Sequence, residues 1–283
     1  MNTPVEAIAA NASRSVLRRR ERALAACDAV MARLIEAAGP CTMHARLERT
    51  PFESLASSIA HQQLNGAVAA RILERFVALY APASFPHPAA LLATDEAALR
   101  AVGFSFAKIR ALRDLAEKTQ AGIVPEATEL VALEDHHIID RLTQVRGIGP
   151  WTVQMMLMFQ LGRPNVLPID DFGVRNGFRL AYGLKGLPTP RALAEFGQRW
   201  QPHCSMAAWY LWRAVDLARE GKLPKPPRPP RIAIQKQRVA LKKAPKKKQK
   251  KVQRPRQRAA SARKRAAPAR KRVAPARRRT ARG

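Results

Sequence analysis

The stretch "LTQVRGIGPWTVQMML" (Leu142–Leu157) places two glycines between two segments that have the apolar spacing of helices. The pattern predicts that one helix ends at about Val145 and that a second begins at Pro150, because proline is favoured in the first turn of a helix. A simple connector needs one glycine at most. Gly147 and Gly149 together indicate a turn whose backbone lies very close to another group.

This turn has the chemistry of an anion site. Glycine permits positive φ and leaves no Cβ above the backbone, and the second helix would direct its first N–H groups outward at the positive end of its dipole. We expect Ile148 to insert into the core beneath the turn and fix the hairpin. Taken alone, the G-x-G pattern fits a tight interhelical turn without a ligand better than a phosphate site.

The chain on both sides of the hairpin also has helical spacing, and no long alternating pattern of a β-strand appears, which indicates an all-α protein. Ser13–Gly39 predicts one helix, and Thr50–Ala81 predicts a helical stretch that begins at a Thr50 cap and is interrupted at Gly66. Shorter helices are predicted at 95–101, 105–121, 134–144, 150–161, 171–182, 190–200 and 204–219.

Charge divides the 283 residues unevenly. The formal net charge is +30, but residues 221–283 hold 26 lysines and arginines and no acid. The remaining 25 basic and 21 acidic residues leave residues 1–220 with a net charge of only +4. We therefore expect a mildly basic globular body and a disordered tail rich in Lys, Arg, Pro and Ala that binds a polyanion, with nucleic acid favoured over an anionic membrane surface.

The cysteines exclude several kinds of site. Cys27, Cys41 and Cys204 are far apart and form no C-x-x-C pair. This argues for a reducing compartment and against a disulfide framework, a structural zinc or a four-cysteine iron–sulfur cluster. The sequence also contains no recognisable signal peptide and no apolar run long enough to span a bilayer.

A second motif, "NVLPIDDFGVRNGF" (Asn165–Phe178), brings two adjacent carboxylates to the start of a predicted helix. One acid there is explained as an N-cap. The second needs another explanation, and we expect it to face a cleft near the hairpin. The third feature is aromatic: for Trp200 and Trp209 we prefer core packing, whereas Trp151, directly after the turn, is harder to place in a core.

Taken in order, these motifs resemble the helix-hairpin-helix (HhH-GPD) DNA glycosylase superfamily, and most closely its 3-methyladenine DNA glycosylase II branch. The hairpin and the "VLPIDDFGVRNGF" loop resemble its hairpin and Gly/Pro…Asp loop. "SSIAHQQLNGAVAARI" (Ser57–Ile72) resembles its Q-Q-x-S-x-x-A-A segment, with Asn65 at the serine position. "WQPHCSMAAWYLW" (Trp200–Trp212) resembles its W-x-P-x-R-S-x-A…W segment, with Cys204 at the arginine position.

The resemblance implies two helical subdomains with an active-site cleft between them. Residues 1–51 and 164–220 would form a discontinuous subdomain that carries the aspartate loop. Residues 52–163 would form the subdomain with the hairpin, and 221–283 would be the tail. The resemblance also implies an enzyme that acts alone as a monomer on double-stranded DNA.

Roles transfer by position. The essential aspartate falls on Asp171, which leaves Asp170 as the cap or orienting residue. The residues that would line the base pocket, fill the gap left by the flipped nucleotide or contact the base are Trp151, Trp212, Met155 (a tyrosine in some relatives), Leu64 and Gln63. The residues that would contact DNA at the hairpin are Gly147, Ile148, Gly149 and Thr152.

The resemblance further implies an alkali-metal ion, Na⁺ or K⁺, on the carbonyls of Thr143, Val145 and Gly147, and no cofactor for catalysis. Trp151 stands where bifunctional relatives carry a lysine nucleophile, so we expect hydrolysis by water without a lyase step.

The hypothesis is a monofunctional glycosylase that removes alkylated purines in base excision repair, in the cytoplasm of a bacterium, associated with the nucleoid, or in a eukaryotic nucleus. Two alternatives stay open: excision of uracil, hypoxanthine or mismatched bases, and a non-catalytic DNA-binding protein that uses only the hairpin and the tail.

Overall fold

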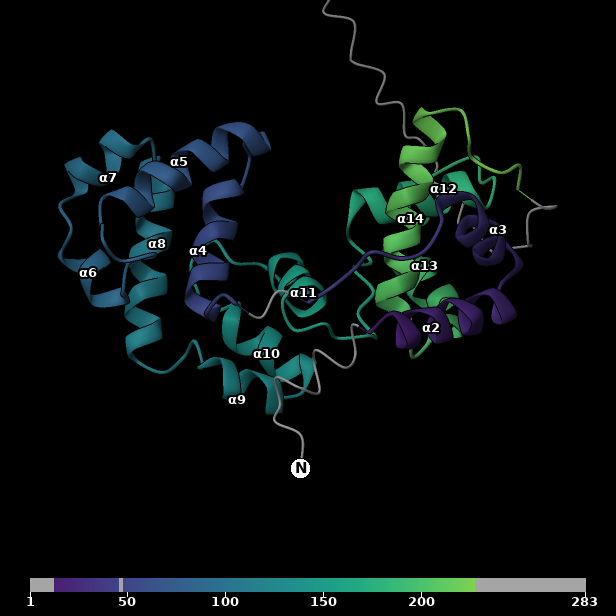
Figure 1. The fold of residues 1–283 in the computed structure, drawn as a ribbon, viewed down its shortest axis with the longest axis horizontal. Helices are drawn as coiled ribbons and strands as arrows, with labels where there is room; N and C mark the ends of the chain where they lie inside the picture. Colours follow the sequence, from purple (N-terminus) through teal and green to yellow (C-terminus); the bar gives the residue numbers. More distant parts are fainter. Residues whose placement is uncertain (1–12, 46–47, 227–283) are drawn as a thin grey trace, which may run out of the picture. The chain divides into compact units, whose positions relative to one another are not determined.

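The computed structural model describes residues 13–45 and 48–226, and these residues form helices and loops without a β-strand (Figure 1). The all-α prediction is therefore confirmed for this part of the chain. The predicted tail falls almost entirely outside the described residues.

The helices are α2 (Arg14–Cys27), α3 (Ala29–Ala38), α4 (Pro51–His61), α5 (Gly66–Ala78), α6 (Pro88–Ala93), α7 (Glu96–Val102), α8 (Phe106–Gln120), α9 (Ala127–Ala132), α10 (Asp135–Leu142), α11 (Pro150–Phe159), α12 (Phe172–Ala181), α13 (Pro190–Gly197), the 3₁₀ turn η1 (Gln198–Trp200) and α14 (Cys204–Arg219).

Three predictions about the helices need comment. The single helix predicted at Ser13–Gly39 is wrong, because Asp28 leaves the helical conformation (φ −150°, ψ 111°) and caps α3, which divides the segment into α2 and α3. The break predicted at Gly66 is confirmed, since α4 ends at His61 and α5 begins at Gly66. The short helices α6 and α9 were not predicted, because six residues are too few to establish a helical period.

The helices pack in two sets. In one, α4 lies against α5, α8 and α11, and α8 also contacts α6 and α7. In the other, α14 contacts α12, α3 and α2. A Cβ at Gly177 of α12 would lie 1.8 Å from the Leu211 carbonyl oxygen of α14, so only glycine permits the two backbones to approach this closely. All described residues fall within one compact unit, and the division into two subdomains stays a prediction.

In the part of the chain that the structure describes, no helix combines the length and apolarity of a membrane span. The core consists of the inward faces of the helices. Trp200 is fully buried, which confirms its assignment to the core, and Trp209 is partly buried against that core. The remaining two tryptophans, Trp151 and Trp212, lie at the site described next.

Candidate active site

Asp171 is the centre of the candidate site, and it is also the N-cap of α12. Its Oδ1 accepts the backbone N–H of Val174 at 2.7 Å. Of the prediction that Asp170 is the cap or an orienting residue, the first half is therefore wrong. Because α12 begins at Phe172 and not at the predicted residue 171, the cap position falls on Asp171, while the Asp170 side chain is exposed.

Two indole rings hold the Asp171 carboxylate. Trp212 Nε1–H donates to Oδ1 at 2.9 Å, and Trp151 Nε1–H donates to Oδ2 at 2.8 Å. Together with the Val174 amide, three N–H donors therefore orient one half-buried carboxylate. Hydrogen bonds to an ionised acceptor are short and strong, so these three donors hold the Asp171 side chain in one fixed orientation.

The two tryptophans differ in their surroundings. Trp212 is partly buried, and its ring stacks on Phe159 at a centroid distance of 5.9 Å. A Cβ at Gly173 would lie 2.8 Å from Trp212 Cδ1 and 3.1 Å from Asp171 Oδ1, so a larger residue at position 173 would displace both groups. Trp151, in contrast, is 48 % exposed. One ring is built into the protein, and the other is open on the surface beside the carboxylate.

In the hairpin, α11 begins at Pro150 as predicted, whereas α10 ends at Leu142 and not at about Val145. Ile148 is 4 % exposed and packs in the core, and Gly147 has a positive φ of 78°. Gly149 has an ordinary negative φ of −103°, and a Cβ there would meet nothing within 4 Å. Neither the backbone conformation nor the packing of the protein requires glycine at position 149. The missing side chain leaves open space above the turn.

The amides of the turn divide into two groups. The N–H groups of Gly147 and Gly149 donate to no other described residue, whereas the Thr152 amide donates to the Gly149 carbonyl at 3.0 Å. The Thr152 side chain is buried as well. Among the predicted contact residues, the two glycines therefore keep amides without a described partner, whereas Ile148 and Thr152 are buried.

Helix α8 supports the turn from behind. Asp114 Oδ2 accepts the Arg146 amide at 2.6 Å, and Lys118 Nζ bonds both the Asp114 carboxylate, at 2.8 Å, and the Gln144 carbonyl, at 2.6 Å. Burial raises the pKa of Asp114, but the Arg146 amide and Lys118 outweigh this effect and hold the pKa below its usual value. Sequence reasoning missed Asp114 and Lys118, which have an ordinary i, i+4 spacing with no visible link to the turn.

The loop between α4 and α5, residues 62–65, lies beside the turn. Gln62 Nε2–H donates to the Gly147 carbonyl at 2.8 Å. The predicted site residues Gln63 and Leu64 are both exposed, Leu64 by 39 %. The loop is not linked by any described contact to Asp171, so Gln63 and Leu64 adjoin the hairpin and not the carboxylate.

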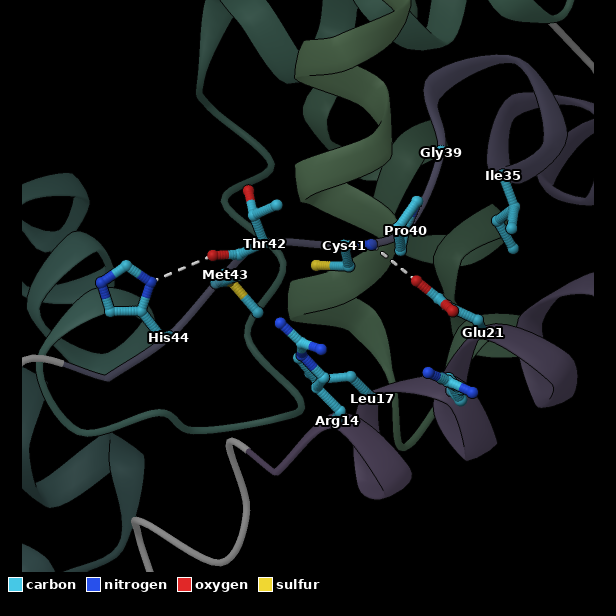
Figure 2. Close-up of a pocket in the computed structure, with 11 residues that line it drawn as sticks. Arg14, Leu17, Glu21, Ile35, Gly39, Pro40, Cys41, Thr42, Met43 and His44 are labelled. Carbon is cyan, nitrogen blue, oxygen red and sulfur yellow. Dashed lines mark hydrogen bonds between the residues drawn. The ribbon is translucent and has the colours of Figure 1, made fainter.

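The larger of two cavities lies away from the predicted site residues, and the smaller one lies next to them. The larger, of about 870 Å³, lies between α2 and the segment 39–44 (Figure 2), where Glu21 Oε1 accepts the Cys41 amide at 2.6 Å; no predicted site residue lines it. A smaller cavity, of about 260 Å³, lies between α4 and α11 and is lined by Met155 and Phe159. Because Phe159 also stacks on Trp212, this smaller cavity adjoins the carboxylate site.

Comparisons with known proteins place this geometry in a family. The model of the HhH-GPD superfamily base excision DNA repair proteins matches residues 56–203. The chain is 36 % identical over 214 residues to DNA-3-methyladenine glycosylase 1 of Schizosaccharomyces pombe, a match that covers 75 % of this chain and 92 % of the relative.

Solved structures agree with that assignment. The 3-methyladenine DNA glycosylase of S. pombe, in complex with abasic DNA, matches 71 % of this chain and 98 % of its own at 35 % identity and a TM-score of 0.64. DNA-3-methyladenine glycosidase from Bacillus halodurans matches 71 % of this chain and 91 % of its own at 33 % identity and a TM-score of 0.65. The chain therefore belongs to the HhH-GPD superfamily of base excision DNA repair proteins, in the branch of the 3-methyladenine DNA glycosylases.

Proposed function

We propose that the protein hydrolyses the N-glycosidic bond of alkylated purines in duplex DNA, with Asp171 as the catalytic residue. One observation carries the proposal: a carboxylate at a helix N-terminus is fixed by two indole N–H groups beside an exposed tryptophan ring. Cleavage of the bond between base and sugar develops positive charge on the sugar ring. A preorganised carboxylate stabilises that charge and orients the attacking water.

Trp151 and Trp212 would have different roles in binding the base. Trp151 has an open ring on which a base can stack, whereas one face of the Trp212 ring is covered by Phe159. An alkylated purine is often cationic, and cation–π attraction to an indole contributes on the order of 1–2 kcal/mol when the site is desolvated. A cationic base is also a good leaving group, so the reaction needs no general acid. The cavity lined by Met155 and Phe159 is the space that we assign to the rest of the flipped base.

DNA would be held at the hairpin. The Gly147 and Gly149 amides are unoccupied by other described residues and suit a backbone phosphate, with room for its close approach. The S. pombe relative, solved with abasic DNA, supports DNA as the ligand. Leu64 is the exposed apolar side chain that we assign to the gap left by the flipped nucleotide.

The carbonyls of Thr143, Val145 and Gly147 fit an alkali-metal ion in their chemistry. The Val145 carbonyl accepts the Ile148 amide at 3.0 Å and the Gly147 carbonyl accepts Gln62, but each oxygen has a second lone pair. An ion at these oxygens would add positive charge next to the phosphate.

The tail, residues 221–283, would add binding without base recognition, because its 26 basic residues attract phosphates of any sequence. A chain truncated after Glu220 should release base at the same single-turnover rate. The log–log salt slope of its affinity for undamaged duplex should become shallower by about 0.9 for each phosphate that the tail would have neutralised. An unchanged slope would point to a protein or membrane partner for the tail.

The experiment that tests the function compares release of free base from three duplexes, which contain N-methylated purine, uracil or hypoxanthine. We expect release from the methylated duplex. We also expect no borohydride-trapped complex with abasic DNA, since Trp151 supplies no amine. Release from the uracil or hypoxanthine duplex alone would reassign the substrate, and no release from any of them would support a DNA-binding protein without catalysis.

A further inference from the structure

The loop 62–65, which carries Leu64, contains an unusual backbone conformation. Gln63 has φ 57°, and it is the one residue other than glycine with positive φ in the described part of the chain. Such a conformation is uncommon for glutamine and persists where surrounding contacts hold it. The Gln63 and Leu64 side chains are exposed, so burial of these side chains does not explain it.

The loop is anchored at both ends. At its end, Asn65 Oδ1 accepts the Val68 amide at 2.9 Å and caps α5. At its start, Gln62 Nε2–H donates to the Gly147 carbonyl at 2.8 Å, across 85 residues of sequence. The Asn65 contact is local and fixes only the entry into α5. The Gln62 contact is the link that ties the loop to the hairpin.

The hairpin end of this link is rigid. The Arg146 amide is bonded to Asp114, the Gln144 carbonyl is bonded to Lys118, and Ile148 is buried in the core. Gly147 is thus held on both sides; its amide has no acceptor among the described residues, and its carbonyl accepts Gln62. The turn that we assign to phosphate binding therefore also holds the loop that carries Leu64, through the Gly147 carbonyl.

We propose that Gln62 is a positioning residue that sets the distance between the bound phosphate and the inserted Leu64. The inference rests on the proposed function and adds a mechanical link to it. With the link in place, a duplex gripped at Gly147 and Gly149 meets Leu64 in one fixed register. Without it, the duplex is still gripped, but Leu64 enters less often, and the target nucleotide flips less often.

The test is Gln62→Met, which keeps the length of the side chain and removes its donor. A fluorescent 2-aminopurine beside the lesion reports flipping, single-turnover base release at saturating enzyme reports the chemistry, and titration with undamaged duplex reports the grip. We expect base release to fall about ten- to hundredfold, since a small misplacement of the reacting groups slows the reaction strongly. The fluorescence gain should fall severalfold. Affinity for undamaged duplex should stay within about twofold, because the two glycine amides are untouched.

The matched control is Gln120→Met at the exposed end of α8, which should change none of the three readings. A purely structural role would lower the unfolding temperature and weaken all three readings together. Equal values for Gln62→Met and wild type, or a parallel decrease of affinity and base release, would overturn the proposal.

A second variant separates the donor from the shape. Gln62→Glu keeps the size of the side chain but is ionised at neutral pH and cannot donate to the Gly147 carbonyl. Base release by this variant should therefore fall as it does in Gln62→Met. Base release equal to that of wild type would contradict the proposal. If wild type releases no base at all, the proposed function fails, while 2-aminopurine fluorescence still tests Gln62.

Discussion

Two aspartates of this protein have the same local role and opposite surroundings. Asp28 caps α3, and Asp171 caps α12. Each also accepts a tryptophan indole N–H, from Trp200 at 3.0 Å in the first case and from Trp151 and Trp212 in the second. Viewed locally, the two motifs are nearly the same: an aspartate at a helix start that holds an aromatic ring.

The difference lies in the second carboxylate oxygen. Asp28 is 8 % exposed, and its Oδ2 accepts both Trp200 and the hydroxyl of Tyr182 in the core. Asp171 is half-buried, and its Oδ2 accepts only Trp151, whose side chain is about half exposed. The charge of Asp28 is fully used by the protein. The charge of Asp171 remains accessible to a ligand, and this accessibility distinguishes a candidate catalytic group from a structural one.

The largest effect should come from removing the accessible charge. We expect Asp171→Asn to lower single-turnover base release by about a thousandfold, because it removes an electrostatic contribution to the transition state. Its free energy of unfolding should change by less than about 1 kcal/mol, since asparagine caps helices as well as aspartate does. Affinity for the duplex should be intact or slightly higher. Activity within a few-fold of wild type would remove Asp171 from the mechanism, and an equal decrease in Asp170→Asn would move the role to its neighbour.

The buried aspartate should give the reverse result. Asp28→Asn turns one acceptor into an N–H₂ group that faces the donors of Tyr182 and Trp200. We expect the free energy of unfolding to fall by about 3 kcal/mol, as for a buried group left without its partner. Urea titration measures this value. Base release per folded molecule should be unchanged, and a selective decrease of activity at unchanged stability would break the comparison.

The tryptophans that donate to the two aspartates test the same difference between the exposed and the buried site. Trp151→Phe removes one N–H donor to a charged acceptor, about 1.5 kcal/mol, so base release should fall about tenfold with little change in stability. Trp200→Phe removes the corresponding donor in the core and should lower the free energy of unfolding by about 2 kcal/mol without an effect on base release. Denaturation and single-turnover assays on both variants should therefore give opposite patterns. The same pattern in both would indicate that exposure does not separate the two sites.

The smallest effect is a dependence of stability on pH. Burial, and then the negative charge of Asp28, raise the pKa of Tyr182 well above its usual value. The contribution of the neutral Tyr182 side chain to the free energy of unfolding is therefore fully present below the usual tyrosine pKa of about 10. This contribution is lost as the pH rises further, because the unfolded chain releases the Tyr182 proton at a lower pH than the folded protein does. Burial also raises the pKa of Cys41 and Cys204 to about 11, so both thiols contribute to the loss of stability in the same alkaline pH range. Tyr182→Phe keeps the thiols, so its stability should fall less steeply than that of wild type above pH 10. Parallel curves would contradict this assignment.

Sequence motifs identify the helical fold and bring Asp171, Trp151 and the hairpin to attention, because these features depend on neighbours in the chain. They misplace the cap on Asp170, because an error of one residue in a helix boundary changes which side chain occupies the cap. The G-x-x-x-G spacing of Gly173 and Gly177 is a signal for close helix packing that the sequence interpretation missed. The bond from Gln62 to Gly147 could not be predicted, since no local pattern links residues 85 positions apart.

The double role of Asp171 has an evolutionary consequence. The aspartate that we propose as the catalytic residue also caps a helix, and asparagine can replace it with little cost to folding, since the two residues cap comparably. A single substitution would thus leave a stable chain that keeps its hairpin and its open tryptophan ring. A change at this one position would therefore separate binding of a damaged duplex from removal of its base, without an unfolded intermediate sequence.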